Sequence, residues 1–118
     1  MQYLKNNDIY KVIRITGAQD NILGISFGEN DVEIDNTDIE IVEWKFDNIK
    51  SDIVYTSKEE VLKQVLFGLK SINIALKTNY KLSKIYFCPF DKPHYKIYSS
   101  LVRKLILHYH YGRKFKEV

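Results

Sequence analysis

Apolar residues recur every three or four positions in the middle of the chain, which is the spacing of an amphipathic α-helix. The residues that share one face are Val61, Leu62, Val65, Leu66, Leu69, Ile72, Ala75 and Leu76. Ser57 and Glu60 form a capping box in front of them, because the hydroxyl can accept from a backbone N–H while the carboxylate reaches back. The pattern therefore predicts a long helix from Ser57 to Asn79.

A second helical stripe occupies the C-terminal part of the chain. Its apolar members are Ile97, Tyr98, Leu101, Val102, Leu105, Ile106 and Tyr109. Asp91 can cap the first turn and Pro93 is tolerated there, while Gly112 suits the left-handed residue after a helix end. We expect the basic tail beyond it, residues 113–118, to fray.

The N-terminal half alternates apolar and polar residues, and turn residues interrupt it about every ten positions. The predicted strands are residues 9–16, 23–27, 32–34 and 39–46. Strands joined by such short turns form an antiparallel meander. In the last segment the apolar face changes between Ile41 and Val42, and a β-bulge would account for the change.

Residues 84–88 are a short apolar run that Pro89 closes, which is typical of an internal strand covered on both faces. A strand, a long helix and another strand form a crossover, which favours parallel pairing. The predicted fold class is therefore α+β: an N-terminal four-stranded antiparallel meander, a long helix, a fifth strand and a C-terminal helix (ββββαβα). At 118 residues, the chain has the length of a single globular domain, residues 1–118.

The composition indicates a soluble globular protein. Apolar residues make up 45% and charged residues 28% of the chain, which argues against disorder. No apolar run could span a bilayer, and residues 1–15 lack the features of a secretory signal. The lone Cys88 excludes an internal disulfide, which suits a reducing compartment. We therefore expect a cytoplasmic protein that does not interact with membranes.

Charge is distributed unevenly along the chain. Residues 20–47 carry nine acidic residues and one basic residue, a net charge of −8, whereas residues 77–118 carry ten basic and two acidic residues, a net charge of +8. One interpretation is that these are solvated surfaces that attract each other within the fold, since exposed charges contribute little to stability. The other is that one of them is a recognition surface.

Each charged region defines a candidate interaction surface. The acidic set could select a basic protein partner, and it comprises Glu29, Asp31, Glu33, Asp35, Asp38, Glu40, Glu43 and Trp44, the last as an anchor. The alternative, basic set could follow a nucleic-acid backbone, and it comprises Lys92, Lys96, Arg103, Lys104, Arg113 and Lys114. Tyr95, Tyr98, Tyr109 and Tyr111 lie among these basic residues and could stack on bases. Binding that weakens as the salt concentration rises would identify a nucleic-acid partner of the basic set.

The sequence contains no complete set of residues for binding a metal or a cofactor. His108 and His110 lie two positions apart on a predicted helix and so point to different sides. Cys88 and His94 have no second cysteine with which to complete a zinc site, and Cys88 closes an apolar strand where an inert thiol is the usual outcome. We predict no metal and no cofactor.

An enzyme is the weakest of three hypotheses. His94, with Lys92, Tyr95 and Lys96 nearby, could supply acid–base and phosphate-stabilising groups for RNA cleavage. The same residues are better explained as the exposed first turn of a helix, and no nucleophile, base and orienting group occur together. We therefore expect no catalytic residues.

The small size, the composition rich in Asn, Ile and Lys, the strand meander followed by helices, and the acidic run Glu29–Asp47 without a catalytic motif resemble one protein class. The chain resembles bacterial immunity proteins of polymorphic toxin systems, including those of contact-dependent growth inhibition. The resemblance implies a protein that binds a cognate toxin domain, often a nuclease, and occludes it, with carboxylates in place of substrate phosphates. It carries no individual residue over.

The first hypothesis is therefore a non-enzymatic immunity protein that neutralises a toxin through its acidic surface. The second is a small RNA- or DNA-binding protein that uses the basic C-terminal part.

Overall fold

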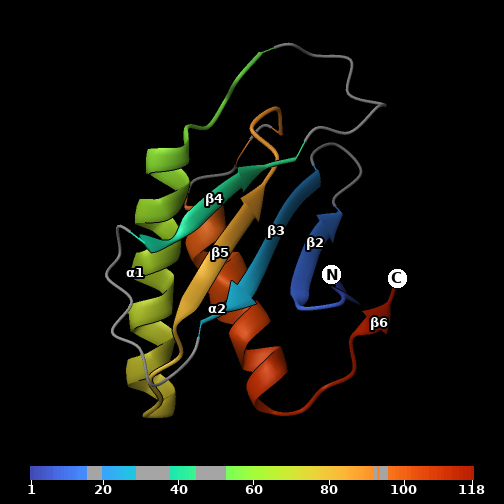
Figure 1. Ribbon diagram of the computed structural model, residues 1–118, viewed down its shortest axis with the longest axis vertical. Helices are drawn as coiled ribbons and strands as arrows, with labels where there is room; N and C mark the ends of the chain where they lie inside the picture. The colour runs from blue at the N-terminus through green and yellow to red at the C-terminus, as the bar shows by residue number, and fades with distance from the viewer. Residues whose placement is uncertain (16–19, 29–37, 45–52, 92, 94–95) are drawn as a thin grey trace.

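Six strands and two helices make up the described part of the protein, and they confirm the predicted α+β class (Figure 1). The computed structural model describes residues 1–15, 20–28, 38–44, 53–91, 93 and 96–118. The strands are β1 (Gln2–Asn6), β2 (Ile9–Ile15), β3 (Asp20–Phe27), β4 (Glu40–Glu43), β5 (Leu82–Phe87) and β6 (Lys116–Glu117). The helices are α1 (Lys58–Leu76) and α2 (Ile97–His110).

The strands form one mixed sheet in the order β4-β5-β3-β2-β1-β6. β1, β2 and β3 are an antiparallel meander. β5 pairs antiparallel with β3 on one side and parallel with β4 on the other. The internal position of β5 and the parallel crossover through α1 are therefore confirmed. The predicted four-stranded meander is wrong, because β4 contacts β5 and not β3.

Two local features of the sequence account for this difference. β1 has the sequence QYLKN, which is too short and polar for its alternation to be recognised. The second half of β5, Ile85 to Phe87, is buried on both faces and so favours a position between two neighbours, which separates β3 from β4. The predicted strand at residues 32–34 lies outside the described residues.

β4 is shorter than the strand predicted at residues 39–46, and it has no bulge between Ile41 and Val42. Its four residues pair with β5 in unbroken register, Ile41 opposite Ile85 and Val42 opposite Tyr86. Both residues are half-buried although they lie on opposite faces of the sheet, so a change of apolar face needs no bulge. The register irregularity of this sheet region lies in β3, between Ser26 and Phe27.

α1 begins as predicted. The Glu60 N–H donates to the Ser57 hydroxyl over 3.2 Å, which is one half of the predicted capping box, and Glu60 Oε1 accepts from Gln64 Nε2 over 3.0 Å. The helix ends earlier than Asn79, with Lys77 in the left-handed conformation. Asn73 then fixes the turn into β5, because its Oδ1 accepts from the Tyr80 N–H (2.9 Å) and its Nδ2 donates to the Tyr80 carbonyl (3.0 Å).

α2 begins later than predicted, at Ile97, and Asp91 does not cap it. The Asp91 N–H instead donates to the Cys88 carbonyl in the turn after β5. Lys96 is the left-handed N-cap residue and provides no side-chain cap. A residue of α1 substitutes for it: Gln64 Oε1 accepts from the Tyr98 N–H over 3.2 Å. The start of α2 is thus fixed by tertiary contact.

Both helices cover the same face of the sheet (Figure 1). Buried residues on that face, such as Val12, Ile25 and Ile85, form one core with the buried sides of α1 and α2. The helices approach closely at Gly68, where an added Cβ would lie 2.5 Å from the Ser99 carbonyl oxygen. The opposite face of the sheet carries no described helix.

The C-terminal tail returns to the sheet. Gly112 has φ +64° and ends α2 as predicted. Residues 113–118, which we expected to fray, carry β6, which pairs parallel with β1, and the Val118 N–H donates to the Lys5 carbonyl over 3.0 Å. Phe115 packs edge-on against Tyr3 and Tyr10. The tail therefore covers the outer edge of β1.

Candidate functional site

The described carboxylates of the predicted acidic surface gather at β4, the outermost strand at one end of the sheet. We call Asp38, Glu40 and Glu43 the acidic edge. All three are exposed. Glu40 has a side chain that is 64% exposed and lies 3.8 Å from Lys84 Nζ. The remaining predicted acids, Glu29, Asp31, Glu33 and Asp35, lie outside the described residues.

Trp44 lies next to the acidic edge, on the face of the sheet opposite the helices. Its ring stacks on Tyr86, with centroids 5.2 Å apart and planes at 21°. Its far end lies over Gly24, where an added Cβ would be 2.6 Å from the ring. Lys11 Nζ is 5.1 Å from the ring centroid. Trp44 is therefore a half-buried sheet-face residue whose position depends on a glycine.

The face around Trp44 is mixed in charge. Lys11 and Lys84 point to the same side as Glu40, as the register of β2, β5 and β4 requires. Ser26 and Tyr86 lie between them with hydroxyl oxygens 3.5 Å apart. Among the described residues, the acidic character predicted for the sheet is thus concentrated at the β4 edge and does not extend across the face.

The alternative, basic set divides into two groups. Lys96, Arg103 and Lys104 are exposed along α2. Arg113 and Lys114 are exposed beyond its C-terminal end, so the length of α2, about 21 Å, separates them from Lys96. Lys92 lies outside the described residues. The predicted basic surface is therefore not one continuous patch.

Most of the tyrosines near the basic residues have structural roles. Tyr98 is fully buried, and burial raises the pKa of its hydroxyl to about 12. Tyr109 packs on Tyr10 and Phe27 in an aromatic cluster. Tyr111 is 61% exposed, with the Arg113 guanidinium 5.9 Å from its ring centroid. Tyr95 lies outside the described residues.

The residues considered for metal or acid–base chemistry lie apart. Cys88 is fully buried, and burial raises the pKa of its thiol. His108 stacks on Tyr3 and lies 2.8 Å from the Lys114 carbonyl oxygen, whereas His110 Nδ1 lies 2.8 Å from the Tyr80 hydroxyl. His94 is outside the described residues. Within the described ranges, no three His, Cys, Asp or Glu side chains come together as metal ligands.

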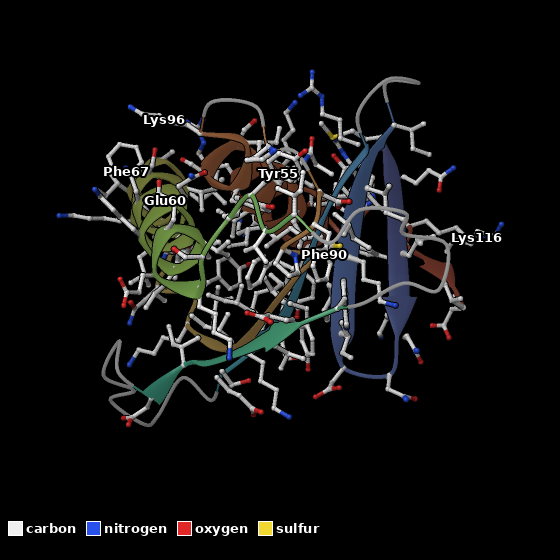
Figure 2. All side chains as sticks on the ribbon, turned by 90° about the horizontal axis from the view of Figure 1, so that it is seen from above. Tyr55, Glu60, Phe67, Phe90, Lys96 and Lys116 are labelled. Atoms are coloured by element: carbon white, nitrogen blue, oxygen red, sulfur yellow. The ribbon has the colours of Figure 1, made fainter. Side chains whose placement is uncertain are left out.

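The sequence analysis missed an exposed stripe on α1. We call Lys63, Phe67, Lys70, Ile74 and Lys77 the α1 stripe. Phe67 is 64% exposed and Ile74 is 69% exposed. Figure 2 shows Phe67 on the outer side of α1. The sequence signal was present, since these positions alternate steps of four and three, but the stronger apolar stripe of the same helix obscured it.

Phe67 separates two surface grooves. One groove, of about 640 Å³, runs between α1 and the start of β4 and includes Ile39, Lys70 and Ile74. The other runs between α1 and α2 and includes Lys63, Lys96 and Ser99. An aromatic side chain on the crest between two hollows can insert into, or be enclosed by, a partner surface.

The chain matches no protein-family model, no curated protein and no solved structure. In the part of the chain that the structure describes, neither helix is long and apolar enough to cross a bilayer. Any assignment of function consequently rests on the surfaces themselves.

Proposed function

We propose that this is a non-enzymatic binding protein, an immunity protein that neutralises a cognate toxin domain by occluding it with the acidic edge. The observation that carries the proposal is the exposure of Glu40 and Glu43 on an outermost strand, with the exposed Asp38 two residues before it. The partner is a basic protein, for instance a nuclease. Its cleft is built to hold phosphates, so carboxylates can occupy the same positions.

The physical role of the acidic edge is chiefly to attract and orient the partner. Charges at the rim of an interface raise the association rate and exclude wrong partners more than they add affinity. Affinity needs an apolar anchor beside them. Trp44 is suited to that role because it is half-buried, immediately follows β4 and is held in place by Tyr86.

The experiment combines genomic context with a protection assay. A large secreted toxin encoded immediately upstream would support the proposal, and its toxin domain would then be coexpressed with this protein. We expect the wild type to protect cells. The triple variant Asp38→Lys/Glu40→Lys/Glu43→Lys should lose protection and associate at least about tenfold more slowly at low salt, since it removes electrostatic attraction.

A matched control reverses three exposed carboxylates outside β4, namely Asp8, Glu59 and Glu117. This control has the same net charge as the test variant, so a general charge effect would reduce protection equally in both. Full protection by the acidic-edge variant, with both variants folded by circular dichroism, would overturn the proposal.

The alternative function is RNA or DNA binding through the helices. The observation that favours it is the groove between α1 and α2, where Lys63 and Lys96 face a common hollow and Arg103 is exposed one helical turn from Ser99. Phosphate contacts by such residues would make the affinity fall steeply with salt.

Fluorescence polarisation with a labelled single-stranded RNA tests this alternative at about 50 and 200 mM salt. Binding that weakens strongly at the higher salt, and is reduced by Lys63→Glu/Lys96→Glu, would support it. The absence of binding at the lower salt would remove it.

A further inference from the structure

The α1 stripe combines exposed apolar residues with lysines in a regular order. Phe67 and Ile74 are seven residues apart, and Lys63, Lys70 and Lys77 lie three or four residues from them. Successive steps of four and three keep Lys63, Phe67, Lys70 and Ile74 on one line along the helix, and Lys77 is the left-handed residue that directly follows its end. The helical part of the line, from Lys63 to Ile74, is about 17 Å long at the rise of an α-helix.

The stripe lies on the side of α1 that contacts neither the protein core nor α2. Val61, Val65 and Ile72 face the core and are buried, whereas all five stripe residues are exposed. Gly68 and Gln64 form the contact with α2. The fold therefore does not explain why Phe67 and Ile74 are large and apolar.

We propose that the α1 stripe is a docking surface for an acidic amphipathic helix of a protein partner. Phe67 and Ile74 would pack against apolar residues of that helix, and the three lysines would face its carboxylates. The proposal is independent of the acidic edge on β4, because it uses different residues and a partner segment of opposite charge.

The regular spacing favours a helix as the occupant. A helix that packs along α1 presents its own side chains with the same three- and four-residue period, so its contacts match the stripe over its whole length. Charge complementarity selects an acidic helix, since the stripe contains three lysines and no carboxylate. Two helices that both carry this stripe would oppose lysine to lysine, which disfavours a second copy of the chain.

Other anionic partners fit less well. A membrane surface binds helices through a continuous apolar face, whereas Phe67 and Ile74 are separated by lysines. Single-stranded nucleic acid stacks on aromatic rings, and Ile74 offers none. A membrane surface and a single-stranded nucleic acid are therefore tested below as alternative partners.

The test uses a synthetic helical peptide of three heptads. Each heptad has leucine at one core position and glutamate at the positions that flank the core. Amide chemical shifts of the ¹⁵N-labelled full chain are followed during titration with the peptide. We expect the largest shifts between residues 63 and 77 of the chain. Phe67→Ala and Lys63→Glu/Lys70→Glu should each weaken binding about tenfold or more, because they remove the anchor or the attraction.

Two controls establish specificity. Lys104→Glu changes an exposed charge on α2 outside the stripe and should leave the affinity unchanged within about twofold. A peptide with lysine in place of glutamate should not bind. Three outcomes would overturn the proposal: chemical-shift changes that map to β4, equal binding of the basic peptide, or no saturable binding. Each would do so whether or not the protein is an immunity protein.

Three further measurements distinguish the other occupants. The protein could bind anionic phosphatidylserine vesicles or single-stranded RNA more tightly than the acidic peptide. If Phe67→Ala abolished that binding, the proposal would be overturned in favour of a membrane or a nucleic acid. A monomer–dimer equilibrium in sedimentation, abolished by Phe67→Ala, would overturn it in favour of a second copy. A monomer that binds only the acidic peptide supports it.

Discussion

Tyr98 places a phenol in the centre of the core. Its side chain is fully buried, and loss of solvation raises its pKa from 10.0 to about 12, while the neighbouring Thr56 hydroxyl acts in the opposite direction. The neutral phenol is therefore the form compatible with folding. An unfolded chain has no such restriction, so the two states bind different numbers of protons at alkaline pH.

The stability of the protein should consequently fall between pH 10 and about pH 12. In that window the unfolded Tyr98 loses its proton and the folded one keeps it, which favours unfolding by about 2–3 kcal/mol. Below pH 10 the contribution of Tyr98 to stability is fully retained. Urea unfolding across this range should show a smaller decrease for Tyr98→Phe than for the wild type. Parallel decreases would contradict the prediction, since all other titrating groups are common to both proteins.

Gly24 is the residue on which the position of Trp44 depends. In Gly24→Ala the new Cβ would overlap the indole, so the ring must move and the free energy of unfolding should decrease by about 1–3 kcal/mol. Trp44 is the only tryptophan, and its fluorescence should shift to longer wavelength as it becomes more exposed. Lys104→Ala, an exposed position on α2 at the other face of the sheet, is the control and should leave the emission unchanged. An unchanged spectrum in Gly24→Ala would be inconsistent with this packing.

At the scale of elements, the pairing of α1 with α2 depends on close backbone approach. Gly68→Ala would place a methyl group 2.5 Å from both the Ser99 carbonyl oxygen and Val102 Cγ1. Alanine has a higher helix propensity by about 1 kcal/mol, yet we expect a net loss of about 1–2 kcal/mol in the free energy of unfolding, because the helices must separate. The exposed Lys70→Ala on the same helix should be nearly neutral. A more stable Gly68→Ala protein would contradict the contact.

The C-terminal tail is held chiefly by one side chain. Phe115 contacts Tyr3, Tyr10 and His108, so Phe115→Ala should release β6 from β1 and cost about 1–2 kcal/mol. The Val118 amide, which donates to the Lys5 carbonyl, should then exchange with solvent hydrogen much faster. Tyr111→Ala removes an exposed aromatic residue and serves as the control. Unchanged exchange at Val118 in Phe115→Ala would show that backbone pairing alone retains the tail.

Elements with a strong local signal were predictable, and elements formed by distant pairing were not. α1 has its own cap at Ser57 and a long apolar stripe, and β5 has a continuous apolar run. β6, with two residues, exists only because β1 lies beside it. The start of α2 could not be predicted either, because Gln64 from another helix takes the place of the expected Asp91 cap.

At the scale of the whole molecule, charge along the chain was an incomplete guide to charge on the surface. Of the acidic set, Asp38, Glu40 and Glu43 are exposed at one edge, and their role as a binding surface stays a prediction. The basic set was not recovered as a unit, because a straight helix separates Lys96 from Arg113. Lys63 and Lys70 occur outside the strongly charged segments of the sequence, so a charge count along the chain does not associate them with Phe67 and Ile74.

The position of β4 has a consequence for how the protein becomes active after synthesis. The β1–β2–β3 meander pairs residues that are near in sequence, whereas β4 joins the sheet only through β5, which lies on the far side of the α1 crossover. Contacts between such distant segments form late in folding, because a long loop must close first. A nascent or partly folded chain would consequently lack the acidic edge, so the binding that we propose there would require the completed sheet.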